Sequence, residues 1–248
     1  MQSRNLFAFL SALALTSASP LRRACNGTTT QPTVPAPSTI VTPTLPETGA
    51  ASELPAPGNA TLKHIVVGHG VQNYTCTEAG VLGTSTGAMA VVWEITSMYP
   101  GSGSGALSDA DWNGLTSKVL RTTDMPINQG SFPAQADLTV EGLAAPIKFL
   151  GHHFFDETNT PTFDLSAAQP PELFKGKRDA GVTAPADADK GLTGEGAVDW
   201  LKLSDKGTSN GISLVYRVLT AGGNPATCTE AGEQQSVPYA TMYWMYST

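Results

Sequence analysis

The chain has 248 residues, which is enough for one large domain or two small ones. Charged residues make up only 14%, whereas Gly (25) and Pro (18) are abundant, so the composition favours a loop-rich, mostly β protein over long charged helices. The formal net charge of −7 argues against a nucleic-acid or anionic-membrane partner, because both need a basic protein surface.

The first 18 residues have the pattern of a secretory signal peptide. Arg4 supplies the positive charge, residues 6–15 form a short apolar run, and Thr16-Ser17-Ala18 offers small residues for cleavage. The apolar run is too short to span a bilayer, and no other stretch is long enough. We therefore expect a secreted protein, extracellular or cell-wall associated, with no transmembrane segment.

Residues 19–60 are rich in Thr, Pro and Ala and show no apolar periodicity. A segment of this composition cannot bury a core, so we expect a disordered linker at residues 19–60 and a single β-rich domain at residues 61–248. Secretion also gives meaning to three N-x-Ser/Thr sequons, which make Asn26, Asn59 and Asn73 candidate glycosylation sites.

The sequence Thr-Cys-Thr-Glu-Ala-Gly occurs twice, at residues 75–80 and 227–232, each time after a β-branched or alternating run. Cysteines pair in an oxidising compartment, and the matched flanks favour a disulfide between Cys76 and Cys228. This bond would join the first strand of the domain to its last hairpin. By closing a loop of about 150 residues it would stabilise the fold by roughly 4–5 kcal/mol. Cys25 is left over, and its fate stays open.

Taken in chain order, the apolar and β-branched runs predict short strands separated by Gly and Pro turns. A capping box at residues 108–111 precedes Trp112, Leu115 and Val119 at helical spacing, so one short helix is expected there. The expected strands are residues 65–71, 89–96, 138–140, 146–155, 162–165, 200–203, 212–220 and 237–246, with a polar loop at residues 177–196. The pattern predicts an all-β sandwich or barrel with one short helix.

Several motifs within residues 61–248, taken together, resemble a known family of secreted domains of unknown function. The motifs are GVQNYTC at residues 70–76, HHFFD at residues 152–156 followed by PTFDL at residues 161–165, VDWLKL at residues 198–203, YRV at residues 216–218 with Gly222-Gly223 and Cys228, and VPYA at residues 237–240. The family occurs in filamentous fungi and, more divergently, in bacteria, and its fungal members are sometimes labelled malate dehydrogenase. The resemblance implies secretion and a single domain, and it brings no established catalytic residues.

A dehydrogenase would need a dinucleotide-binding motif. Residues 101–106 formally match Gly-x-Gly-x-x-Gly/Ala, with Asp124 about twenty residues further on. The run is more typical of a flexible turn after Pro100, and the rest of the chain lacks the repeated βαβ units of a nucleotide-binding domain. A secreted protein would also meet little nicotinamide cofactor. We therefore expect neither nicotinamide-dependent malate dehydrogenase activity nor a bound cofactor.

The strongest cluster for chemistry lies at residues 152–164. The candidate catalytic residues are His153, Asp156 and Asp164, and the candidate ligands for zinc or copper are His69, His153 and Asp156, with His64 as an alternative to His69. Because neighbouring residues of a strand point to opposite faces, His152 and His153 cannot both join one site. The alternative is a histidine hydrogen-bonded near a turn, with the carboxylates capping residues 159–161. The chain has only four histidines and no tight ligand spacing, which favours this alternative.

The last predicted strand places Tyr239 and Tyr243 on one face and Trp244 and Tyr246 on the other. One face is expected to be core. The other, if exposed, would give a flat surface on which sugar rings stack, although aromatic residues are usually buried. The leading interpretation is a non-catalytic secreted glycoprotein that binds cell-wall polysaccharide or another extracellular surface. The rival is a metal-dependent extracellular enzyme that uses residues 152–164.

Overall fold

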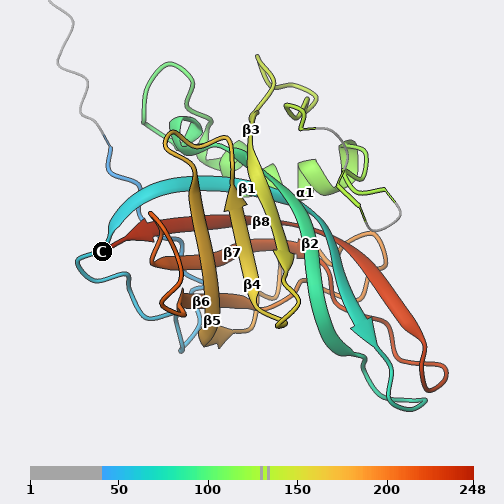
Figure 1. Cartoon of the computed structure of the whole chain (residues 1–248). Coiled ribbons are helices and arrows are strands. Elements are labelled where there is room, and N and C mark those ends of the chain that lie inside the picture. The colour runs from blue at the N-terminus through green and yellow to red at the C-terminus, as the bar shows by residue number, and fades with distance from the viewer. Residues whose placement is uncertain (1–40, 129–130, 133–134) are drawn as a thin grey trace, which may run out of the picture. The chain divides into compact units, whose positions relative to one another are not determined.

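The computed structural model describes residues 41–128, 131–132 and 135–248, so the predictions for Met1–Ala18, Cys25 and Asn26 lie outside the described residues. Within these residues, eight antiparallel strands form a closed barrel in which each strand pairs with the next and β8 pairs with β1 (Figure 1). The strands are β1 (Thr61–Thr75), β2 (Thr84–Glu94), β3 (Lys148–Phe155), β4 (Pro161–Leu165), β5 (Glu172–Val182), β6 (Trp200–Asp205), β7 (Leu214–Gly222) and β8 (Gln234–Ser247). The predicted all-β class is confirmed, as a barrel.

The first and last strands close the barrel by pairing along almost their whole length. Their register runs from the pair Thr61–Ser247 to the pair Thr75–Gln234. In Figure 1 these two strands and β7 cross behind β3, β4 and β5. A closed barrel has no free sheet edge, so the backbone groups of every strand find partners within the sheet.

A disulfide joins Cys76, directly after β1, to Cys228, in the loop between β7 and β8. The predicted link between the first strand and the last hairpin is therefore confirmed. Backbone hydrogen bonds tie the same two loops together. The N–H of Cys76 donates to the carbonyl of Glu233 (2.9 Å), and the N–H of Cys228 donates to that of Val81 (2.8 Å).

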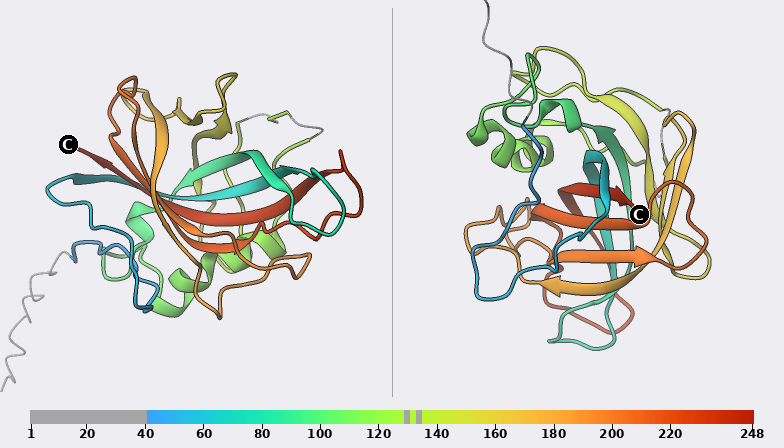
Figure 2. Two further views of the ribbon diagram at one scale, coloured as in Figure 1. Left: turned by 90° about the horizontal axis from the view of Figure 1, so that it is seen from below. Right: turned by 90° about the vertical axis from the view of Figure 1, so that its left-hand side faces the viewer.

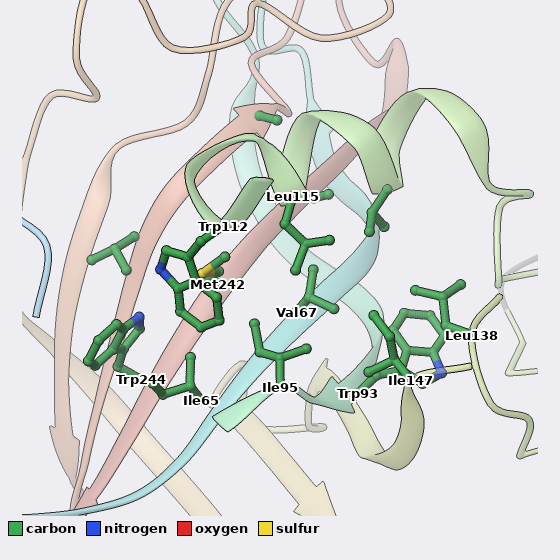
Figure 3. Close-up of a cluster of buried hydrophobic side chains, with 14 of the residues drawn as sticks. Ile65, Val67, Trp93, Ile95, Trp112, Leu115, Leu138, Ile147, Met242 and Trp244 are labelled. Carbon is green, nitrogen blue, oxygen red and sulfur yellow. The ribbon is translucent and has the colours of Figure 1, made fainter. Parts of the chain in front are cut away.

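Alternation along β1 divides its side chains between two hydrophobic cores. Val66 points into the barrel, where it is buried with Phe163 and Phe174. Its neighbours Ile65 and Val67 point outward and belong to a second core between the barrel wall and the helix (Figure 3). Full burial of one such side chain contributes about 1.5–3 kcal/mol, so both faces of this strand stabilise the fold.

The helix α1 (Asp109–Thr122) and the short 3-10 helix η1 (Thr96–Met98) lie between β2 and β3 in the sequence. Ser108 caps α1 as predicted, because its Oγ accepts a hydrogen bond from the N–H of Asp111 (3.1 Å). The buried side chains Trp112, Leu115 and Val119 face β1, β7 and β8. Figure 2 shows α1 on the outer side of the barrel, and Figure 3 shows its side chains Trp112 and Leu115 directed toward the strands.

Residues 41–60 lie against the barrel, which corrects the expectation of a disordered linker over this part of the chain. Leu45 and Leu54 pack on the outer core. The hydroxyl of Tyr216 donates a hydrogen bond to the carbonyl of Pro55 (2.8 Å). The sequence does not predict this packing, because two widely spaced leucines among prolines and small residues produce no periodic pattern.

The strand predictions fail at two places. β5 includes residues 177–182, which were expected to form a loop. Its charged residues lower the apolar content of this segment, but pairing of the strand with β4 and β6 holds it extended. Residues 138–140 contribute only an isolated bridge between Leu138 and Ile147. No helix in the described part of the chain is long and apolar enough to cross a membrane.

Candidate functional site

The lumen of the barrel has one filled half and one hollow half. Around the start of β1 it is filled by a cluster that includes Val66, Phe163, Phe174 and Met245. Toward the end of β1 the lumen contains a cavity of about 430 Å³. An eight-stranded barrel is just wide enough for side chains to fill it or for one small ligand to enter. The hollow half is therefore the candidate functional site.

An ionic cluster lies at the filled end, away from the cavity wall. His64 Nδ1 is 2.6 Å from Glu94 Oε2, and its Nε2 is 3.1 Å from Glu172 Oε2. Lys63 Nζ is 3.0 Å from Glu172 Oε1. Burial lowers the pKa of His64, but the hydrogen bonds and charges of the two glutamates outweigh it and raise the pKa above its ordinary value. These groups satisfy one another and act as a structural ion cluster.

All eight strands contribute side chains to the cavity wall. The polar ones come chiefly from β1 (Gln72), β3 (His153), β5 (Arg178), β7 (Arg217) and β8 (Tyr243). The strands β2, β4 and β6 contribute mainly small or apolar side chains. Alternate residues of each strand face the lumen, so groups that are far apart in the sequence converge there.

Small residues on β1 and β2 leave room for two tyrosines. A Cβ atom at Gly68 would lie 2.8 Å from the ring of Tyr243, so only glycine lets this ring lie flat on β1. The hydroxyls of Tyr239 and Tyr243 are 2.9 Å apart. Burial raises the pKa of both, which keeps both protonated at neutral pH. Since one hydroxyl donates to the other, the pair retains one O–H proton for a further partner.

His153 is the central histidine of the cavity wall and is held in one tautomer. Its ring stacks on Phe163 at a centroid distance of 4.1 Å and lies 5.4 Å from the ring of Tyr243. Its Nδ1 lies 2.9 Å from the carbonyl oxygen of Thr162, which can only accept, so Nδ1 carries the proton. Burial, aided by the charge of Arg217, lowers the pKa of His153 to about 4. At neutral pH His153 is uncharged, and its Nε2 is an acceptor.

Arg217 places a positive charge at the cavity wall. Its Nε and Nη2 both donate to the backbone carbonyl of Asp199, at 3.0 and 2.8 Å. The carboxylate of Asp199 turns instead toward Arg178, 3.7 Å away, in a pair whose side chains are 47% and 59% exposed. Arg178 and Asp199 thus form the solvent-facing rim. The half-buried guanidinium of Arg217 forms no ion pair with a carboxylate among the described residues.

Gln72 adds an unused donor to the same wall. The residue is 5% exposed, and its Nε2 has no hydrogen-bond partner among the described residues. The neighbouring Tyr239 hydroxyl does not meet hydrogen-bond geometry with it. A buried amide without a partner costs about 1–3 kcal/mol, and such groups are rare in folded proteins.

The structure separates the residues that the sequence combined into one metal or acid–base site. His153 faces the lumen, whereas Asp164 is exposed on the outer face, opposite His152. His69 also points outward, and it is buried with its Nδ1 2.9 Å from the carbonyl oxygen of Tyr239. No group of three or more His, Cys, Asp or Glu side chains placed to hold a metal ion occurs in the described residues. The predicted cluster of ligands does not form, because its residues lie on opposite sides of the barrel wall.

Asp156 follows the alternative prediction and caps the turn between β3 and β4. Its Oδ2 accepts from Lys175 Nζ (2.9 Å), and its Oδ1 accepts from the N–H groups of Thr158 (2.9 Å) and Thr160 (3.1 Å). The hydrogen bond from Lys175, followed by those from the turn, holds the pKa of Asp156 well below its usual range. Its carboxylate is thus occupied by structural partners.

The aromatic residues of β8 do not form an exposed platform. Tyr239 and Tyr243 point into the lumen, and Trp244 and Tyr246 are buried in the outer core. Their predicted division between two faces is confirmed, but the flat sugar-stacking surface is corrected because both faces are covered. Of these four side chains, that of Tyr243 lines the cavity.

Gln72 and Arg217 are site residues that the sequence does not mark as such. Both lie within motifs that carry the family resemblance, at residues 70–76 and 216–218. A lone glutamine and a lone arginine have no chemical signature by spacing. The available signal was the inward register of Gln72, two residues after Gly70 and four after Gly68 on one strand.

The sequence profile of a family described as "Protein of unknown function (DUF3455)" matches residues 56–247. No match was found among curated proteins or among solved structures. The matched range begins just before β1 and includes the last residue of β8, so it contains the whole barrel and every residue of the cavity wall. The chain therefore belongs to the DUF3455 family of proteins of unknown function.

Proposed function

We propose that this protein is a secreted, non-catalytic binding protein that holds a small molecule in the hollow half of its barrel. The observation that carries the proposal is the cavity of about 430 Å³, to which all eight strands contribute. Ligand pockets typically have volumes of roughly 300–1,000 Å³ and combine an apolar lining with a few placed polar groups. The cavity matches this description in size and in lining.

Binding is favoured over catalysis by the state of the one histidine in the cavity. A general base works best with a pKa near the working pH, whereas the pKa of His153 is lowered to about 4. The candidate partners Asp156 and Asp164 do not line the cavity. The ring of His153 is instead held in place by stacking on Phe163 and by its hydrogen bond to the carbonyl oxygen of Thr162. These contacts favour a role in shaping the cavity wall.

The cavity favours a small molecule over the surface of a cell-wall polysaccharide. A polymer surface needs a broad exposed platform, and the aromatic residues of β8 are buried. A lumen closed at its far end by packed side chains takes a compact ligand or the end of a chain. The proposed partner is therefore a small molecule in place of a polysaccharide, and the protein remains a binding protein.

The Cys76–Cys228 disulfide supports secretion, because such bonds persist in oxidising compartments. Asn59 is exposed in a turn just before β1. Asn73 lies on the outer face of β1, with its Oδ1 accepting a hydrogen bond from Ser236 (2.7 Å). We expect the secreted protein to lose mass on glycosidase treatment, and Asn59→Gln to remove one glycan. Secreted protein that carries no glycan at Asn59 would contradict this part of the proposal.

The binding proposal is tested with N-phenyl-1-naphthylamine, a neutral probe whose fluorescence rises in apolar sites. The wild-type protein should bind about one equivalent. Ala88→Leu adds bulk to the cavity wall and should abolish the signal, whereas Ala145→Leu, at an exposed loop position, should leave it unchanged. Thermal unfolding of both variants checks that they are folded. Absence of wild-type binding, or equal binding by folded Ala88→Leu, would overturn the proposal.

A further inference from the structure

The cavity is positively charged within an acidic protein. Its charged wall residues are Arg178, Arg217 and Asp199, which sum to one net positive charge, while the chain as a whole carries −7. His153 adds no charge at neutral pH, because burial lowers its pKa. Asp199 is 3.7 Å from Arg178, so the charge that lacks a carboxylate partner is that of Arg217.

Arg217 is held in place with donors to spare. The carbonyl of Asp199 accepts from Nε and Nη2 and fixes the plane of the guanidinium. A guanidinium has five N–H donors, so further donors remain for another acceptor. Arg217 pairs across the sheet with Tyr243 and with Leu201, which places the charge between a hydroxyl and an apolar side chain. Partly buried charges are usually paired, and here the partner is lacking among the described residues.

Two of the other polar groups near this charge can donate to an acceptor. The tyrosine pair retains one O–H proton, and Gln72 Nε2 has no partner among the described residues. Apolar side chains of the wall include Ala88 and Phe155, on β2 and β3, and Leu201 and Leu203, on β6. The cavity therefore contains a cation and nearby hydrogen-bond donors beside apolar side chains.

From this arrangement we infer the chemical class of the ligand, an inference that rests on the proposed binding function. The cavity takes a small carboxylic acid whose carboxylate binds Arg217 and whose apolar body lies against Ala88, Phe155 and the leucines of β6. A cationic ligand is disfavoured because the one carboxylate of the wall, that of Asp199, is already beside Arg178. A neutral apolar ligand would leave the guanidinium facing it without a counter-charge.

The test is displacement of N-phenyl-1-naphthylamine at neutral pH by two molecules of nearly equal shape, 2-naphthoic acid and 2-naphthamide. The acid is ionised and the amide is neutral. Because charged hydrogen bonds contribute more than neutral ones, the acid should displace the probe at a concentration at least about tenfold lower. This comparison uses the wild-type protein and needs no variant.

Two variants assign the preference to one side chain. Arg217→Met removes the charge and keeps most of the length, so it should bring the acid and the amide to equal potency. Arg121→Met, on α1 and outside the cavity wall, removes an arginine that is paired with Asp189 and should leave the preference within about threefold of wild type. If Arg217→Met does not fold, Arg217→Lys keeps the charge but loses the planar fork and should reduce the preference without abolishing it.

The outcomes separate the two proposals. If the neutral probe binds and Ala88→Leu blocks it, but acid and amide compete equally, the inference about the carboxylate is wrong and the binding function stands. The inference is also wrong if folded Arg217→Met keeps the wild-type preference for the acid, or if Arg121→Met loses it. If the probe does not bind the wild-type protein at all, the binding function itself fails.

Discussion

Removing the Cys76–Cys228 disulfide should cost this fold a large part of its stability. The two cysteines are 152 residues apart, so the bond closes a loop that contains most of the barrel. On the chain-entropy account, a loop of this length restricts the unfolded chain by about 5 kcal/mol. Whole domains are stable by only about 5–15 kcal/mol, so the loss is a substantial fraction of the total.

The assay is urea denaturation of Cys76→Ala/Cys228→Ala against the disulfide-bonded protein, both carrying Cys25→Ala so that no free thiol can exchange. The midpoint of thermal unfolding should fall by about 10–20 °C for a domain of this size. The dependence of the unfolding free energy on urea should become steeper, because the released chain exposes more surface. A loss below about 2 kcal/mol with an unchanged slope would refute the argument from loop length.

Three further predictions concern the helix and the filled end of the lumen. Trp112→Ala should destabilise the protein by about 3–5 kcal/mol in urea denaturation, because it empties a buried site between α1 and the barrel; a loss near zero would contradict the outer core. Ser108→Ala should cost about 1 kcal/mol through loss of the helix cap, and Ser108→Gly less; equal losses would contradict the cap. His64 has a raised pKa, so protonation of its ring favours the folded state. The stability it contributes is complete below about pH 6.5 and is lost as the pH rises through the higher folded value. Relative to His64→Gln, wild-type stability measured across this range should therefore fall with increasing pH, and a constant difference would contradict the cluster with Glu94 and Glu172.

The sequence predicts those parts of the barrel in which a short local pattern of residues decides the structure. β8 is recognised from alternating aromatic residues, α1 from Ser108 and the spacing of Trp112 and Leu115, and the disulfide from a repeated hexapeptide. The sequence does not predict the second half of strand β5, because pairing of the strand with its neighbours β4 and β6 stabilises it. Its charged residues are tolerated since pairing on both sides satisfies the backbone.

The candidate site is harder to predict, because a barrel lumen is assembled from single residues of separate strands. His153 is identified from its histidine pair, but its partners are set by register, which brings Tyr243 beside it and leaves Asp164 on the far side of the wall. Register depends on bulges such as the one between Val218 and Ala221, which have no clear sequence signal. Hence the chemistry of the cavity becomes visible only in three dimensions.

We have proposed that the hollow half of the barrel is a binding site for small carboxylic acids. The most direct measurement is a crystal structure of the protein with 2-naphthoic acid. We expect the ring system to lie in the lumen beside Ala88 and Leu201, with the carboxylate bound to Arg217. An empty lumen at saturating acid, or a ring bound on the outer face of the barrel, would contradict it.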